Sequence, residues 1–176
     1  MKVDIFNADK KYNIIYADPP WSYGDKQNSK TRGGAIKHYC TMKTKDICNL
    51  PIKNILGENC VLFLWVTSPL LEDCFDVIKS WGFKYKSSFI WDKILHNMGH
   101  YNSVRHEFLL ICTKGKATPQ TKKLLDSVVS IERTKKHSQK PKEFRDIIDF
   151  LYPKGNRIEL FAREYADGWD CWGNEV

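Results

Sequence analysis

The sequence predicts an α/β fold, an open sheet with helices on both of its faces. Short apolar segments typical of buried strands alternate with amphipathic segments of helical periodicity. That alternation favours a sheet enclosed between two layers of helices. No repeat, low-complexity tract or linker rich in Pro, Gly or Ser interrupts it. The length of 176 residues suits a substantial core, so residues 1–176 are expected to form a single domain.

The amino-terminal elements are a strand, a loop and a short helix. Residues 12–17 have the pattern of a buried strand, ended by Pro19 and Pro20 because proline has no amide hydrogen to donate to a sheet. Residues 22–38 are polar and contain three glycines, which is typical of a loop. A short helix is expected from Thr44 to about Leu50, with Thr44 as its cap.

The central elements are a strand and a longer helix. Cys60–Thr67 is the clearest apolar segment and indicates a buried strand. Ser68 has the side chain of an N-cap, and Pro69 suits the first helical position. The helix expected at 69–81 places most of its apolar residues on one face, and Gly82 ends it.

The carboxyl-terminal half continues the alternation. Strands are expected at 84–91 and 107–113, a helix at 141–151 and a last strand at Arg157–Ala162. In open α/β sheets, ligands bind beyond the carboxyl ends of the strands, where the strand order reverses. This rule directs attention to the residues just after the first and last strands.

The tetrapeptide Asp18-Pro19-Pro20-Trp21 follows the first strand. Chance should produce it in only about one in a few thousand chains of this length. One interpretation is a simple strand-ending turn, for which two prolines are well suited.

The same residues also suit the methylation of an amine conjugated to an aromatic ring, whose lone pair is delocalised. The Asp18 carboxylate and the Pro19 carbonyl can each accept one amine hydrogen, which returns the lone pair to nitrogen and aims it. The Trp21 ring offers a face for stacking a base.

Composition excludes several classes of protein. The longest apolar run, 61–66, is far shorter than the roughly 18 residues of a transmembrane helix. The amino terminus lacks a signal-peptide core, so a cytoplasmic protein without membrane association is expected. The six cysteines include no CxxC pair, and no His/Cys cluster has zinc-site spacing. Free thiols in a reducing compartment and no bound metal are therefore expected.

The net charge of +7 is modest, but its basic residues concentrate at 26–37 and 114–142. Charge alone leaves nucleic-acid binding open. The loops expected at 22–38, 93–104 and 115–137 all carry lysine or histidine, and together they are expected to form a basic rim for phosphates.

Beyond the tetrapeptide, landmarks along nearly the whole chain resemble the MT-A70-type adenine-N6 methyltransferases, in the family's order. They are Tyr39-Cys40-Thr41-Met42, Leu62 to Thr67, Trp91-x-Lys93, His106-Glu107, Lys114-Gly115, Ser138 to Pro141, Arg157 to Arg163, Gly168-Trp169 and Trp172-Gly173-Asn174. The resemblance implies a Rossmann-like methyltransferase sheet in permuted order, with the catalytic strand first and the cofactor strand last. That order accounts for the missing GxGxxG loop.

The resemblance also implies S-adenosyl-L-methionine as cofactor, held by residues from both ends of the chain. Asp18 would contact it, and Lys140 would face its carboxylate or ribose side. The residues expected near its ribose and adenine are Asp4, Ile5, Arg163, Asn174 and Glu175.

On the substrate side, the resemblance implies adenine N6 in nucleic acid, oriented by Asp18 and Pro19. The residues expected to hold the base or its surroundings are Trp21, Tyr23, Tyr39, Trp91, Lys93, His106 and Glu107. A base in a duplex would have to flip out to reach Asp18. The compact chain favours DNA over RNA and a bacterial or phage setting, with a homodimer or a partner subunit as open possibilities.

Several alternatives remain open. Taken singly, Lys140 suits a solvated surface lysine, Arg163 a partner of Asp167 or Glu164, and Trp91 a core residue. The same chemistry on RNA, methylation of a protein or small-molecule amine, and a non-catalytic nucleic-acid-binding subunit are competing functions. A degenerate subunit is expected to lose the aspartate or the tryptophan of the tetrapeptide, and both are present here.

Overall fold

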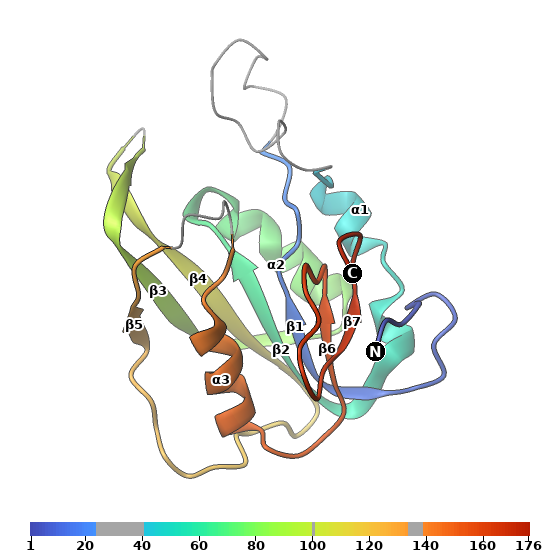
Figure 1. Ribbon diagram of the computed structural model, residues 1–176. Helices are drawn as coiled ribbons and strands as arrows, with labels where there is room; N and C mark the ends of the chain where they lie inside the picture. Colours follow the sequence, from blue (N-terminus) through green and yellow to red (C-terminus); the bar gives the residue numbers. More distant parts are fainter. Residues whose placement is uncertain (24–40, 100, 134–138) are drawn as a thin grey trace.

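The computed structural model describes residues 1–23, 41–99, 101–133 and 139–176. Its seven strands form one sheet in the order β5-β3-β4-β2-β1-β6-β7 (Figure 1). β4 runs antiparallel to both of its neighbours, and all other neighbouring strands are parallel. In Figure 1, α3 lies in front of the sheet and α2 behind it, which confirms the predicted α/β fold with helices on both faces.

The elements have the following bounds. The strands are Tyr12–Ala17 (β1), Leu56–Val66 (β2), Lys84–Met98 (β3), Ser103–Lys114 (β4), Val128–Ser130 (β5), Arg157–Leu160 (β6) and Asp170–Trp172 (β7). The α-helices are Thr44–Cys48 (α1), Leu71–Ser80 (α2) and Lys142–Leu151 (α3), and two 3-10 turns lie at Ile52–Ile55 and Ser68–Leu70.

Two apolar cores lie on opposite faces of the sheet. On β1, Ile15 and Ala17 point to the core shared with α1 and α2, whereas Ile14 and Tyr16 point to the core shared with α3. β2 alternates in the same way and is buried on both sides. Strands enclosed between helix layers lose their polar face, which is why these segments read as continuous apolar runs.

Helix α3 forms where the sequence predicts a helix. Pro141 precedes its first turn, and Phe144, Ile148 and Leu151 form one buried stripe at helical spacing. The Phe144 ring packs edge-on against the Trp65 ring, with their centroids 4.8 Å apart. This contact fixes α3 over the middle of the sheet.

The predicted loop at 93–104 is wrong. β3 continues to Met98 and β4 begins at Ser103, so the two strands form a long ribbon. Its polar sequence hides the strand, because pairing between two strands needs no apolar face. The strands β5 and β7 were not predicted, since three residues are too few to show a period.

Predicted element ends also need correction. Thr44 is the first residue of α1 and Ser68 the first of a 3-10 turn, and neither side chain caps a helix. β6 ends at Leu160 instead of Ala162, because Phe161 takes a left-handed conformation with φ of 61°. Residues 115–127 lie at the opposite end of the sheet from Asp18, where the Gln120 amide donates to the carbonyl of Leu151 at the end of α3.

In the described part of the chain, no helix is long and apolar enough to cross a membrane.

Candidate active site

The site lies where the strand order reverses. β1 pairs with β2 on one side and with β6 on the other, so the residues after β1 and β6 emerge side by side. Asp18 follows β1, and Arg163 comes soon after β6. Ligands of open α/β sheets bind in such a crevice.

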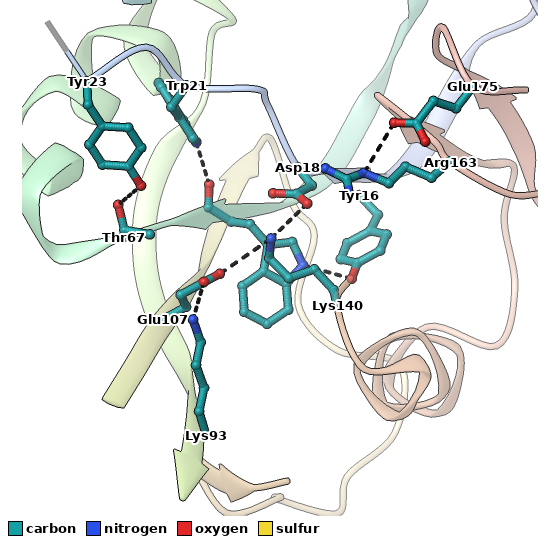
Figure 2. A network of polar contacts seen from close by, with 11 residues as sticks. Tyr16, Asp18, Trp21, Tyr23, Thr67, Lys93, Glu107, Lys140, Arg163 and Glu175 are labelled. Carbon is teal, nitrogen blue, oxygen red and sulfur yellow. Dashed lines mark hydrogen bonds and ion pairs between the residues drawn. The ribbon is translucent and has the colours of Figure 1, made fainter. Parts of the chain in front are cut away.

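A chain of ion pairs crosses this edge of the sheet (Figure 2). The Lys140 Nζ atom lies 2.7 Å from Oδ2 of Asp18 and 3.4 Å from Oε2 of Glu107. Glu107 also accepts a hydrogen bond from Lys93. The Lys140 side chain is only 12% exposed, so it is no solvated surface lysine.

The charges in this chain of ion pairs stabilise one another. Burial alone would lower the pKa of Lys140, but the carboxylates of Asp18 and Glu107 outweigh burial and raise it. Burial would likewise raise the pKa of Glu107, and the ammonium groups of Lys140 and Lys93 outweigh it and lower it. Both groups are therefore charged at neutral pH, which keeps a fixed cation beside the Asp18 carboxylate.

Two tryptophans form the floor beneath the lysines. Lys140 Nζ lies 5.4 Å from the ring centroid of Trp65, and Lys93 Nζ lies 4.9 Å from that of Trp91. The Trp65 indole donates to the Tyr16 hydroxyl at 2.7 Å, and the Trp91 indole donates to the backbone carbonyl of Ile131. Trp91 is 3% exposed, so the structure gives it a core position instead of a free face for a base.

The tetrapeptide is rigidly held. The Trp21 amide donates to the Pro19 carbonyl at 2.8 Å, and the Met42 amide donates to the Pro20 carbonyl at 2.7 Å. The Trp21 ring is 7% exposed, and its indole donates to the Trp65 carbonyl at 3.0 Å. Trp21 therefore ties the turn to the end of β2, and its ring faces are largely covered by protein.

Polar side chains line the site beside β2. The Tyr23 and Thr67 hydroxyls lie 2.8 Å apart, and Ser68 Oγ lies 3.0 Å from Nε2 of His106. The Tyr23 ring is 40% exposed and faces the same edge as Asp18. Tyr39 lies outside the described residues.

The segment after β6 is held to the carboxyl terminus. The Ala162 amide donates to the Trp172 carbonyl at 3.0 Å, and a Cβ on Gly173 would come within 2.2 Å of the Ala162 carbonyl oxygen. This close approach brings Arg163 Nε within 3.6 Å of Glu175 Oε1, an ion-pair partner that its neighbours in the sequence did not suggest.

The remaining expected cofactor residues lie at the two chain ends. Residues 1–3 pair alongside β7, and the Phe6 and Trp172 rings contact each other edge-on at 6.4 Å. Asp4 is exposed and accepts hydrogen bonds from the next turn of chain, whereas Ile5 is fully buried in the core. Asn174 is exposed close to Glu175 in the chain.

The MT-A70 family model matches residues 12–175. The matched region includes the tetrapeptide, Lys140 and the segment from Arg157 to Glu175. The chain belongs to the MT-A70 family. Asp4 and Ile5 lie outside the matched residues.

Individual MT-A70 relatives cover the chain almost completely. It is 39% identical to the type II methyltransferase M.MunI of Mycoplasma sp, over 95% of this chain and 78% of the relative. It is 27% identical to the N(6)-adenine-specific methyltransferase METTL4 of Mus musculus, over 98% of this chain and 39% of the relative. It is 26% identical to the N6-methyladenosine RNA methyltransferase MTA1 of Pyricularia oryzae, over 99% of this chain and 50% of the relative.

Sequence reasoning missed part of this MT-A70 site. Arg145 in α3 holds Glu159 of β6 with a 2.6 Å bond, and burial raises the pKa of Glu159 despite that cation. The hydroxyl of Tyr16 supports Trp65 from the same face. Tyr16 and Trp65 occupy alternating positions that point to the same face in two neighbouring strands. The sequence contained this signal, but using it required knowing that β1 pairs with β2.

Among the residues that the structure describes, no group of three or more His, Cys, Asp or Glu side chains has the arrangement of a metal site. The cysteines in that part of the chain, Cys48, Cys60, Cys74, Cys112 and Cys171, are free thiols.

Proposed function

We propose that this protein transfers a methyl group from S-adenosyl-L-methionine to the N6 amine of adenine in DNA. The observation that carries the proposal is the Asp18 carboxylate at the carboxyl end of β1, bonded to Lys140 and followed by the rigid Pro19 carbonyl. Membership of the MT-A70 family over residues 12–175 supports the same chemistry. We further propose that residues 1–176 act as a single methyltransferase domain.

Asp18 and Pro19 supply the two acceptors that the amine needs. Lys140 holds Oδ2 of Asp18, and the other carboxylate oxygen can accept an amine hydrogen. The Pro19 carbonyl uses one lone pair for the Trp21 amide, and a carbonyl has a second. With both hydrogens held, the nitrogen lone pair leaves the ring system and is aimed in one direction. Asp18 is also placed to receive the proton that nitrogen loses after transfer.

The donor set of the crevice fits the cofactor. Lys140 and Arg163 are cations suited to its carboxylate, while Asp18 and Glu175 can accept from its ammonium and ribose hydroxyls. Phe6, beside Trp172, exposes 60% of its surface and offers an apolar face for adenine. When bound, S-adenosylmethionine supplies the methyl group on a sulfonium centre.

The charge distribution supports a polyanionic substrate. Three segments begin and end at the edge that carries Asp18, namely 24–40 after Tyr23, the hairpin residues 93–106, and 131–140 before α3. They contain ten of the Lys and Arg residues against two acids, a net charge of +8, and all five histidines. The rest of the chain sums to −1, so the basic residues concentrate in the three segments that begin and end at this edge, which supports a substrate with a phosphate backbone.

DNA is the substrate that we favour over RNA. The 39% identical relative is named a type II methyltransferase and is of similar size, since the chain spans 78% of it. The relative named for RNA is 26% identical and twice as long as the matched region. RNA, a protein amine and a non-catalytic partner role remain outcomes of the test.

The deciding experiment supplies the protein with cofactor labelled on the methyl group. DNA from a host without adenine methylation, the same DNA heat-denatured, total RNA and a basic protein mixture are offered separately. After digestion to nucleosides, label is expected in N6-methyladenine from DNA. Label in RNA or protein alone would replace the substrate assignment, and no label in any arm would reject catalysis.

A further inference from the structure

The ribbon formed by β3 and β4 extends beyond the rest of the sheet. Phe108 pairs with Val66, the last residue of β2, and β4 begins five residues earlier at Ser103. At about 3.4 Å per residue, the ribbon therefore projects roughly 17 Å past the carboxyl end of β2. Figure 1 shows its far end standing beyond the edge from which β1 emerges.

The base of the ribbon is braced, so the projection is a fixed feature. Asp92 accepts from the Ile94 amide at 3.0 Å, from Arg105 at 2.8 Å and from the Ser130 hydroxyl at 3.1 Å. The hydrogen bond from the Ile94 amide is the largest cause that lowers the pKa of Asp92, so its charge persists at neutral pH. One carboxylate thus ties β3 to both β4 and β5.

A bulge directs apolar side chains outward. β3 uses the four residues 93–96 where β4 uses Arg105 alone, and Ile94 takes a left-handed φ of 64°. A β-branched residue in that region is strained, and such strain is typical of functional segments. Ile94 and Leu95 are about half exposed, at 47% and 48%.

The end of the ribbon carries large side chains that are fully open to solvent. Met98 and Tyr101 are each 102% exposed. The sequence from 93 to 106 contains no acidic residue. Apolar wedges such as Met separate base steps in proteins that deform DNA, and a tyrosine ring can stack on any base.

We propose that this ribbon enters a groove of duplex DNA beside the target adenine, where Met98 and Tyr101 occupy the space in the base stack left by the extruded base. The inference rests on the proposed function, because a base reaches Asp18 from a duplex only by leaving the stack. The missing acidic charge and the shared edge with Asp18 favour DNA over a protein partner.

The test compares native DNA with the same DNA after heat denaturation, since both carry identical sequences. The Met98→Ala, Tyr101→Ala double variant is expected to methylate native DNA about 5- to 150-fold more slowly, the range that corresponds to the stacking of one base on an aromatic ring. Its rate on denatured DNA should equal that of the wild type. Tyr101→Phe keeps the ring and should retain both rates. Leu124→Ala is the matched control, because Leu124 is 92% exposed away from the site.

Several results would overturn the inference. For the double variant, these are an unchanged rate on native DNA or an equal loss of rate on both substrates. For the wild type, it is methylation of denatured DNA alone. Sedimentation showing that the double variant dissociates a dimer of this chain would also overturn the inference. If the wild type methylates nothing, the proposed function fails on its own. In that case, fluorescence anisotropy measures the affinity of the double variant and of the wild type for a duplex containing an adenine mismatch. Equal affinities would overturn the inference about the ribbon.

Discussion

At the residue scale, Lys140 connects the two halves of the site. It lies over the Trp65 ring and bonds to both Asp18 and Glu107. A buried cation with two carboxylate partners is costly to leave unpaired, so the three groups hold one another in place. The arrangement places a cation against Oδ2 of Asp18 while leaving the other carboxylate oxygen for a substrate.

Asp18→Asn is expected to lower the rate of methyl transfer by at least about 100-fold, because an amide accepts the amine hydrogen without negative charge. The fold should persist, since Asp18 lies beyond the end of β1 and Lys140 keeps Glu107 as a partner. Single-turnover methylation and thermal unfolding measure the two effects. Asp76→Asn, on the exposed face of α2, is the control, and normal turnover of Asp18→Asn would disprove the mechanism.

Glu107→Gln tests the electrostatics of the same site through pH. The lysines hold the pKa of Glu107 below its ordinary value of 4.5, so the unfolded chain binds this proton more readily than the folded one. The stabilisation is complete above that value and is lost as pH falls through the folded pKa. Below pH 4.5 the free energy of unfolding should therefore fall more steeply for the wild type than for Glu107→Gln. Urea titrations measure it, and Glu143→Gln, exposed in α3, should keep the wild-type slope.

At the element scale, the joining of β6 and β7 shapes the far side of the crevice. The chain turns at Phe161 in a left-handed conformation, and the backbone at Gly173 packs directly against Ala162. Arg163 and Glu175 are brought together only because these two segments touch. A short edge strand thus positions side chains that lie 12 residues apart in the sequence.

Gly173→Ala is expected to weaken cofactor affinity by at least about tenfold, or about 1.4 kcal/mol. Its Cβ would lie 2.2 Å from the Ala162 carbonyl oxygen and would separate the two segments that carry Arg163 and Glu175. Calorimetry with S-adenosylmethionine in a chelator measures the loss. Gly168→Ala is the comparison variant: it strains the backbone, because Gly168 has a φ of 76°, but no atom lies within 4 Å of its added Cβ. Equal affinities of the two variants would refute this role for Gly173.

At the scale of the whole molecule, the charged residues are unevenly distributed along the sequence. The segments that begin and end at the Asp18 edge sum to +8, and the remainder sums to −1. Under the proposed function, we expect these segments to attract the phosphate backbone and to make the affinity depend on salt. The net charge of +7 does not reveal this distribution, because it does not say where in the chain the charged residues lie.

Replacing Lys26, Lys30 and Lys37 by glutamine should weaken binding to all DNA sequences alike. These residues lie outside the described part of the chain, and the expectation rests on their sequence positions after Tyr23. The slope of log affinity against log salt should flatten by about 0.9 for each phosphate that the protein no longer neutralises. The same change at Lys79, Lys84 and Lys154, which are exposed at the other end of the sheet, is the charge-matched control. Equal slopes for both triple variants would contradict a local phosphate rim.

The sequence by itself determined the fold class and the place of the turn that we propose to be catalytic. The periodicity of apolar residues located β1, β2, α2 and α3, because each of them buries apolar side chains and the sequence shows directly which residues are apolar. The tetrapeptide at 18–21 and the basic segments are likewise local features. Polar or very short strands, such as the outer half of β3 and all of β5 and β7, left no such signal.

Only the tertiary structure decided how these residues meet. The bonds from Lys140 to Asp18 and Glu107 join segments 122 and 33 positions apart, and no local pattern encodes such pairing. From the sequence, Trp21 was expected to stack a base, and Trp91 suited either the core or the substrate side, since an aromatic side chain serves both. The structure buries both rings. The pairing of β1 with β2 brings the Trp65 carbonyl to the Trp21 indole, and the pairing of β3 with β5 brings the Ile131 carbonyl to the Trp91 indole.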